Sequence, residues 1–275
     1  MPPVPSIKLA DGQHIPQFGL GVFQTPADQT AEIVGDAFRL GYRHIDTAAI
    51  YKNEAGVGAA VAASGLARDE LYITTKLWNA EQGYDSGLRA LDTSLATLGL
   101  DTIDLYLIHW PCPANGKFVD SWKALIQAQK DGKVKSIGVS NFRVEDLDRI
   151  AQATGVVPVI NQIELHPYLQ QGALRAYHDQ HGIVTESWSP LARGNELLSH
   201  ATLQAIAAAH GKTAAQVILR WHLQLGLVVF PKSATPSRIK ENIEIFDFVL
   251  SDDDMRAIAA LDTGTRIGPD PATMN

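Results

Sequence analysis

The chain has 275 residues, of which 45% are hydrophobic, so it holds enough apolar material for a large core. Its 23 basic and 30 acidic side chains give a formal net charge of -7, which argues against nucleic acid or an anionic membrane as the main partner. The single cysteine excludes an intramolecular disulfide framework and a multi-cysteine zinc site, and it fits a cytoplasmic protein.

We expect neither a secretory signal nor a boundary between domains in this sequence. Residues 1–6 lack the basic flank and apolar run of a secretory signal. No apolar run approaches the roughly 20 residues that are needed to span a bilayer. Repeats, low-complexity tracts and Gly/Ser-rich linkers are also missing. We therefore expect residues 1–275 to form a single domain with no membrane association.

In chain order, a predicted hairpin is followed by alternating strands and helices. Two short apolar segments flank Asp11-Gly12, a pair typical of a β-hairpin turn. Hydrophobic patterning then predicts strands at 18–22, 42–46, 71–76, 103–109, 134–140, 157–164, 183–188 and 227–230. Helical spacing and end signals predict helices at 26–40, 54–64, 88–98, 122–130, 144–153, 172–181, 203–210 and 213–225, and helix starts at Pro236 and Ser251.

Eight strand–helix units in this length favour an α/β fold of the closed (β/α)₈ type, a TIM barrel. The hairpin before the first strand would then close the bottom of the barrel, away from the chemistry. Alternation of strands and helices alone would also allow an open, doubly wound sheet.

Four side chains that suit acid–base chemistry stand at or just after the ends of three successive predicted strands. Asp46 closes the second strand and Tyr51 follows it, Lys76 closes the third, and His109 closes the fourth. In a barrel these strand ends meet at the face where active sites lie. The four residues therefore make one candidate catalytic site.

Several motifs in order along nearly the whole chain resemble the aldo-keto reductase family. They are Pro16-Gln17-Phe18-Gly19-Leu20-Gly21, Gly41-Tyr42-Arg43-His44-Ile45-Asp46-Thr47-Ala48, Thr75-Lys76-Leu77-Trp78, Ile137-Gly138-Val139-Ser140-Asn141-Phe142, Asn161-Gln162-Ile163-Glu164-Leu165-His166-Pro167 and Phe230-Pro231-Lys232-Ser233. The sequence is most similar to bacterial members such as the 2,5-diketo-D-gluconic acid reductases. The resemblance implies a barrel that binds NADPH at its mouth and reduces aldehydes or ketones to alcohols.

The roles of the four residues are carried over from the family's catalytic tetrad and agree with the chemistry. Hydride transfer to a carbonyl puts negative charge on its oxygen, so the site needs a proton donor there. Tyr51 is predicted to give that proton. Lys76 beside it would lower the pKa of the phenol, and Asp46 would keep the lysine charged. Neutral His109 would orient the substrate oxygen.

Each of these residues also has an ordinary structural interpretation. Asp46 could cap a helix, Tyr51 could be a rim aromatic, Lys76 could form a structural ion pair, and His109 could be a packed core histidine. Their joint occurrence in family spacing favours the catalytic interpretation.

The cofactor site is predicted from one helix start and from strand ends. The Rossmann glycine pattern is incomplete after Gly19-Leu20-Gly21 and after Gly56-Val57-Gly58, so we interpret these as turn or packing glycines. Lys232, Ser233 and Arg238 flank the helix start at Pro236 and predict an anion site. The resemblance assigns it to the 2′-phosphate of NADPH, with Glu241 and Asn242 facing the adenine. By the same resemblance, the remaining cofactor contacts are Ser140, Asn141, Gln162, Trp188, Ser189 and Leu191.

The predicted substrate is a small carbonyl compound, and no other partner is expected. Phe23, Ile50, Trp78 and Trp110 would form the walls of a largely apolar pocket above the tetrad, with His109 at its base. The loop at residues 112–117 and the tail after the Ser251 helix are both shorter than in relatives with bulky steroid or prostaglandin pockets. The resemblance therefore implies an open site for small aldehydes, dicarbonyls and keto-sugars. His178 and His181 are interpreted as surface residues rather than metal ligands, so no metal is predicted. We expect a monomer.

Two other functions remain open from sequence. One is a Schiff-base aldolase on the same barrel with Lys76 as nucleophile, which would require a neutral lysine. The other is a non-catalytic NADPH-binding regulatory subunit.

Overall fold

The computed structural model describes residues 4–194 and 196–275, so residues 1–3 of the predicted domain and Asn195 lie outside the described structure. Eight parallel strands form one sheet, and two antiparallel strands form another. The small sheet consists of β1 (Ser6–Lys8) and β2 (His14–Pro16). The large sheet consists of β3 (Leu20–Gly21), β4 (His44–Asp46), β5 (Tyr72–Leu77), β6 (Ile103–Ile108), β7 (Val134–Ser140), β8 (Ile160–Glu164), β9 (Val184–Trp188) and β10 (Val228–Val229).

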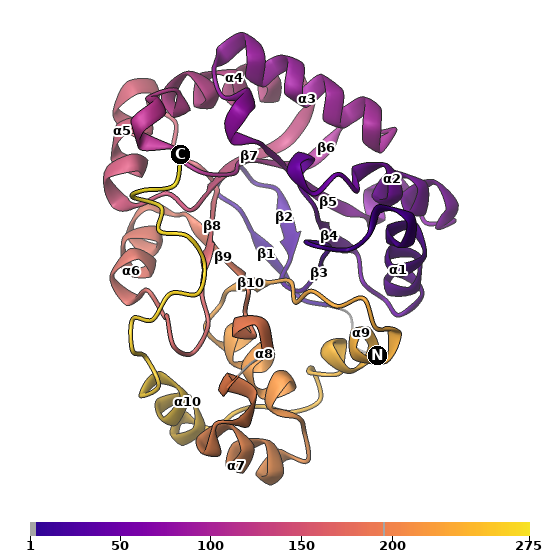
Figure 1. Ribbon diagram of the computed structural model, residues 1–275, viewed down its shortest axis with the longest axis vertical. Helices are drawn as coiled ribbons and strands as arrows, with labels where there is room; N and C mark the ends of the chain where they lie inside the picture. The colour runs from indigo at the N-terminus through magenta and orange to yellow at the C-terminus, as the bar shows by residue number, and fades with distance from the viewer. Residues whose placement is uncertain (1–3, 195) are drawn as a thin grey trace.

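Helices follow the strands in alternation and surround the large sheet (Figure 1). Those described are α1 (Ala27–Arg39), α2 (Glu54–Ala63), α3 (Tyr84–Leu98), α4 (Phe118–Lys130), α5 (Val144–Thr154), α6 (Gly172–His181), α7 (Ala201–His210), α8 (Ala214–Gln224), α9 (Pro236–Ile243) and α10 (Asp252–Ala259). Among the described residues, none of these helices is both long and apolar enough to cross a lipid bilayer.

The strands of the large sheet lie in chain order, each hydrogen-bonded to the next. Its two outer strands are also linked, because Gly19 N donates to Val229 O at 3.0 Å and Gly21 N donates to Pro231 O at 3.2 Å. The prediction of eight parallel strands alternating with helices is therefore confirmed, although individual boundaries differ from the predicted ones. The order brings the carboxyl ends of all eight strands to one face.

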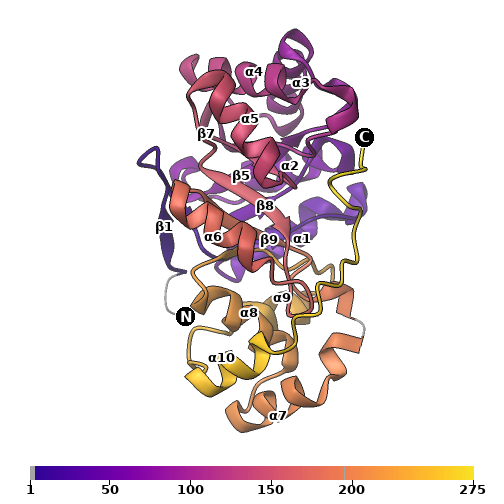
Figure 2. The same ribbon diagram turned by 90° about the vertical axis from the view of Figure 1, so that its left-hand side faces the viewer.

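The predicted hairpin is present and forms its own two-stranded sheet, with Ile7 paired to Ile15. Its side chains Leu9 and Ile15 are buried in one apolar cluster with Leu105 and Val228 of the large sheet. In Figure 2 the hairpin lies on one side of the molecule and the carboxyl-terminal segment lies on the other. The hairpin thus covers the large sheet on the side away from that segment.

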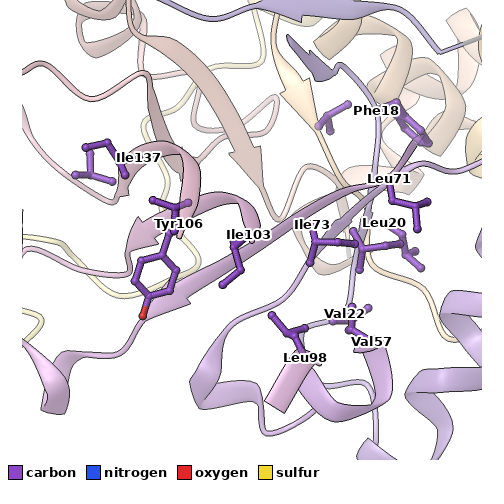
Figure 3. Close-up of a cluster of buried hydrophobic side chains, with 14 of the residues drawn as sticks. Phe18, Leu20, Val22, Val57, Leu71, Ile73, Leu98, Ile103, Tyr106 and Ile137 are labelled. Carbon is purple, nitrogen blue, oxygen red and sulfur yellow. The ribbon is translucent and has the colours of Figure 1, made fainter. Parts of the chain in front are cut away.

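The largest apolar cluster lies between the large sheet and its surrounding helices. Figure 3 shows members of this cluster, among them Leu20 and Ile73 from strands and Val57 and Leu98 from helices. This packing fixes the strands from outside, so that their carboxyl ends can hold polar side chains in place.

Gly56 and Gly58 are packing residues, as predicted from the incomplete glycine pattern. A Cβ on Gly58 of α2 would lie 2.1 Å from the backbone oxygen of Leu98, and one on Gly56 would lie 2.7 Å from Thr30 Cβ. Both distances are far below van der Waals contact. Helix α2 can therefore approach α1 and α3 this closely only where it carries glycine.

Replacing Gly58 with alanine should destabilise the fold, because the added methyl group forces α2 away from the rigid backbone of α3. We expect a loss of about 1–3 kcal/mol in the free energy of unfolding, measured by urea denaturation. Gly35→Ala is the matched control, since the nearest atom to its Cβ is the flexible Arg39 Nη1 at 3.5 Å. That variant should gain up to about 1 kcal/mol from helix propensity. Equal effects of the two substitutions would contradict the close approach.

Candidate active site

The four predicted catalytic residues meet at the carboxyl-terminal end of the large sheet. Asp46 is the last residue of β4, Lys76 is the penultimate residue of β5, and His109 directly follows β6. Tyr51 ends a short 3-10 helix, Ala49–Tyr51, that follows β4. Asp46, Tyr51 and His109 line one cavity, and Lys76 lies buried beside Asp46.

A buried ion pair joins the first two strand ends. Lys76 Nζ donates to Asp46 Oδ1 at 2.7 Å and to Thr47 O at 2.8 Å, and the lysine side chain is fully buried. Burial lowers the pKa of Lys76 and is the largest single effect. The charge and hydrogen bond of Asp46 act together with Tyr51 and Glu186 against it, so the net pKa lies above the usual value. The lysine is therefore an ammonium at neutral pH.

Tyr51 lies against this ammonium, with Lys76 Nζ 5.2 Å from the centroid of its ring. Burial raises the pKa of the Tyr51 hydroxyl, and the positive charge of Lys76 opposes that rise without cancelling it. The predicted effect of Lys76 on the phenol is therefore present, but burial outweighs it and the net pKa of Tyr51 lies above the usual value. Tyr51 consequently carries its proton at neutral pH.

His109 completes the cluster as a neutral imidazole. Burial, reinforced by the charge of Lys76, holds the pKa of His109 well below its usual range. Its ring meets those of Tyr51 and Trp78 edge to face, with centroids 5.8 Å and 5.2 Å away. Within the described residues its buried Nδ1 has no hydrogen-bond partner. The side chain is thus held by packing, and it can present a ring N–H or accept a hydrogen bond without carrying charge.

The cavity above these residues has a volume of about 350 Å³. Every residue predicted for the substrate pocket lines it: Phe23, Ile50, Trp78, His109 and Trp110. Phe23 is 48% exposed, so it lies at the entrance of the cavity rather than in its interior. Tyr51 contacts it with a ring centroid distance of 5.0 Å.

Amide and hydroxyl groups also line this cavity, and hydrogen bonds hold them in place. Asn141 Nδ2 donates to Ser140 Oγ and to His109 O, each at 3.0 Å, while Asn141 Oδ1 accepts from Trp188 Nε1 at 2.8 Å. Gln162 Nε2 donates to Asp46 Oδ2 at 2.9 Å. These bonds fix four of the predicted cofactor residues around one space.

A second cavity of about 700 Å³ adjoins the first, and it holds the other predicted cofactor residues. It is lined by Ser189, Leu191, Lys232, Ser233, Arg238, Glu241 and Asn242. Lys232 and Arg238 are exposed, and neither forms a salt bridge within the described part of the chain. Two cations at the start of α9 therefore remain available for an anion.

Helix α9, which carries Arg238, begins as predicted with Thr235 at the N-cap and Pro236 in the first turn. The Thr235 side chain makes no capping hydrogen bond, and its backbone N–H donates to Ser233 Oγ at 3.1 Å instead. The Tyr42 hydroxyl donates to Ile239 O at 2.7 Å. This bond ties the cation-bearing helix to the segment before β4, and so to the strand that ends at Asp46.

The carboxyl-terminal segment also contributes to the inner cavity, which sequence reasoning missed. Buried Glu164 accepts hydrogen bonds from Ile267 N at 2.6 Å and Gly268 N at 3.0 Å. A Cβ on Gly268 would lie 2.3 Å from Trp188 Cη2, so the segment is pressed onto that ring, and Pro269 lines the cavity. Further lining residues that were not predicted are Gly21, Arg193 and Phe230. The one indication of this contact in the sequence is Glu164, a charged residue at the end of a predicted buried strand.

His178 is not the surface residue that the sequence suggested. It is fully buried, and its ring nitrogens pair with Asn161 Nδ2 at 3.0 Å and Thr185 Oγ1 at 2.8 Å. Across residues 4–194 and 196–275, no three His, Cys, Asp or Glu side chains gather as metal ligands would.

Comparisons with known proteins agree with this geometry. The model of the Aldo/keto reductase family matches residues 17–263. An aldo-keto reductase of Mycobacterium sp. (strain KMS) is 54% identical over 271 residues, which cover 98% of each chain. The methylglyoxal reductase DkgA of Escherichia coli (strain K12) is 52% identical over 266 residues, or 96% of each chain.

Among solved structures, a mutant of Gox0644 crystallised in complex with NADPH is 54% identical to this chain. The two share 98% of their lengths at a TM-score of 0.95. Both the sequence and the fold thus match one family over almost the entire length. The chain belongs to the aldo/keto reductase family.

Proposed function

We propose that the protein reduces small aldehydes, ketones, dicarbonyls or keto-sugars to alcohols, with NADPH as the hydride source and Tyr51 as the proton donor. One observation carries this proposal: the protonated Tyr51 lies beside the buried ion pair of Lys76 and Asp46 and lines a cavity. A second cavity, which contains the cations Lys232 and Arg238, adjoins the first. The enzyme is accordingly an NADPH-dependent oxidoreductase.

The residues present fit an elongated dinucleotide. The two cavities share the lining residues Phe23, Ser189, Pro190, Arg193 and Lys232, so together they form one continuous space. Amide groups of Asn141 and Gln162 suit the carboxamide of a nicotinamide at the inner end, and Trp188 offers it a flat face. Lys232 and Arg238 suit the 2′-phosphate at the outer end. The related Gox0644 structure was crystallised with NADPH. The proposal takes the large sheet as a closed (β/α)₈ barrel, supported by the hydrogen bonds between its outer strands.

NADPH, when bound, supplies a hydride to the carbonyl carbon. As the carbon–oxygen double bond becomes a single bond, negative charge develops on the oxygen, and the Tyr51 proton moves to it to give the alcohol. The phenolate left behind lies beside the Lys76 ammonium, which stabilises it until a proton returns from solvent. Neutral His109 donates a hydrogen bond to the substrate oxygen and holds it near Tyr51.

The two alternatives fit the geometry less well. A Schiff-base aldolase needs a neutral lysine at the reacting carbon, yet the pKa of Lys76 is raised and its nitrogen is fully buried. A regulatory subunit that only binds NADPH has no use for Tyr51 and His109 at an open cavity. Two relatives are named methylglyoxal reductases, which supports small dicarbonyls as substrates of this protein.

Replacing Tyr51 with phenylalanine removes the proton donor and keeps the ring. We expect kcat/KM for methylglyoxal to fall by at least about 100-fold, the usual contribution of general acid catalysis, in an assay that follows NADPH absorbance. NADPH binding should change by less than about twofold, because the lost hydroxyl makes no contact assigned to the cofactor. Tyr84→Phe is the matched control at an exposed tyrosine in α3, and it should keep full activity. Full activity of the Tyr51 variant would remove the proposed donor.

Replacing Arg238 with alanine should weaken the affinity for NADP⁺ about 10- to 100-fold, the range expected for a charge-assisted hydrogen bond to phosphate. The affinity for NAD⁺, which lacks that phosphate, should change little. The measurement is a titration of tryptophan fluorescence with each dinucleotide. Lys240→Ala removes an equal charge from the same helix, where it pairs with Glu244 outside both cavities, and should leave both affinities unchanged. Equal losses for NADP⁺ and NAD⁺ in the Arg238 variant would refute the phosphate assignment.

A further inference from the structure

A second buried carboxyl group, Glu186, stands behind the site and has no role in the chemistry above. It lies in the middle of β9, fully buried, and lines neither cavity. In the sheet it pairs with Gln162 of β8 on one side and Val228 of β10 on the other. A carboxyl group without access to water needs a specific partner to compensate for its lost hydration.

That partner is Gln162. Its Nε2 donates to Glu186 Oε2 at 3.0 Å and to Asp46 Oδ2 at 2.9 Å. A side-chain amide nitrogen carries two hydrogens, so both are already used. Because the other oxygen of Asp46 accepts from Lys76, one chain of hydrogen bonds runs from Lys76 through Asp46 and Gln162 to Glu186.

This arrangement determines which atom of Gln162 remains for a ligand. Rotating the amide by half a turn would point its oxygen at the Asp46 carboxylate, which can only accept. It would also lose the hydrogen bonds from Nε2 to Asp46 and Glu186, which is unfavourable. The carbonyl oxygen Oε1 is therefore the only polar side-chain atom of Gln162 left for the inner cavity that this residue lines. At Gln162 a ligand therefore finds a hydrogen-bond acceptor and no donor.

We propose that Glu186 is a positioning residue: by holding one amide hydrogen of Gln162, it fixes the Gln162 oxygen toward the cavity, where it selects the amino group of the nicotinamide carboxamide. The inference rests on the NADPH site proposed above. It predicts that the inner end of that site prefers a cofactor with an amino group at this position. A cofactor of nearly equal shape that carries a methyl group there should bind more weakly.

The charge state of Glu186 is compatible with this role. Burial, with the charge of Asp46, raises the pKa of Glu186 to about 8. The titratable groups that face it are His44, Asp46, Tyr72 and Lys76. His44 Nε2 lies 3.8 Å from Glu186 Oε1, and burial lowers the pKa of His44 to about 3, so this ring is neutral. At pH 7 Glu186 is therefore a neutral acid that accepts from Gln162 without placing a second negative charge near Lys76.

The test compares binding of NADP⁺ with binding of its 3-acetylpyridine analogue, in which a methyl group replaces the carboxamide amino group. Quenching of tryptophan fluorescence at pH 7 gives the dissociation constant of each. The wild type should bind the analogue about 10-fold more weakly, since the Gln162 oxygen then faces a methyl group. The thionicotinamide analogue, which keeps the amino group, should bind within about threefold of NADP⁺.

Two substitutions of Glu186 separate orientation from simple packing. Glu186→Gln keeps an acceptor oxygen for Gln162 and should preserve the preference within about twofold. Glu186→Leu removes one of the two acceptors of Gln162 and lowers the cost of rotating its amide, so it should reduce the preference at least about threefold. If Glu186 only stabilised the fold, its replacement would instead weaken the binding of NADP⁺ and of both analogues by the same factor.

An unchanged preference in Glu186→Leu would overturn the inference, and so would a wild type that does not discriminate between the two cofactors. If Glu186→Leu does not fold, Gln162→Met removes the selecting oxygen directly, and a preference that survives it overturns the inference equally. A wild type that binds no NADP⁺ would overturn the cofactor proposal and this inference together. Binding that responds to Arg238→Ala but shows no carboxamide preference would overturn this inference alone.

Discussion

The ion pair between Lys76 and Asp46 is the contact on which the site depends. Two opposite charges are fully removed from water, which is unfavourable unless each finds enough partners. Lys76 has the carboxylate and the Thr47 carbonyl oxygen, while Asp46 has the ammonium and the Gln162 amide. Removing either charge would strand the other in the protein interior. The cluster therefore constrains β4, β5 and β8 as well as the phenol above it.

The fold explains why these partners can meet without water. Parallel strands in chain order bring Asp46, Lys76 and Gln162 to one face, and apolar packing between sheet and helices holds the strand ends in register. A single polar network results, in which Tyr51 and His109 border a cavity and Glu186 ends a chain of hydrogen bonds below it. The outer cavity is held in place in a similar way, because the hydrogen bond from Tyr42 fixes α9 to the segment before β4.

Much of this could be read from the sequence, and the failures have physical causes. Alternating strand and helix patterns located the eight parallel strands, and strand ends identified Asp46, Lys76 and His109 because the fold gathers those ends together. The net pKa of Tyr51 could not be predicted, because the sequence does not show how far burial offsets the charge of Lys76. Pro269 was missed because it reaches the cavity through a segment anchored on Glu164, far away in the chain.

His178 was misassigned because the sequence alone does not show that its ring pairs with Asn161 and Thr185 in the protein interior. Glu186 did leave a signal, since it is a charged residue within a predicted buried strand.

The central claim is that the Lys76 charge acts on the Tyr51 hydroxyl. It is tested most directly by the ionisation of that hydroxyl in the protein without ligands. Ultraviolet pH titrations, each corrected by subtracting the matching Tyr51→Phe protein, would isolate this one phenol in the wild type and in Lys76→Met. Because the ammonium stabilises phenolate, the account predicts that Tyr51 ionises at a distinctly higher pH once the ammonium is gone. Ionisation at the same pH in both proteins would contradict it.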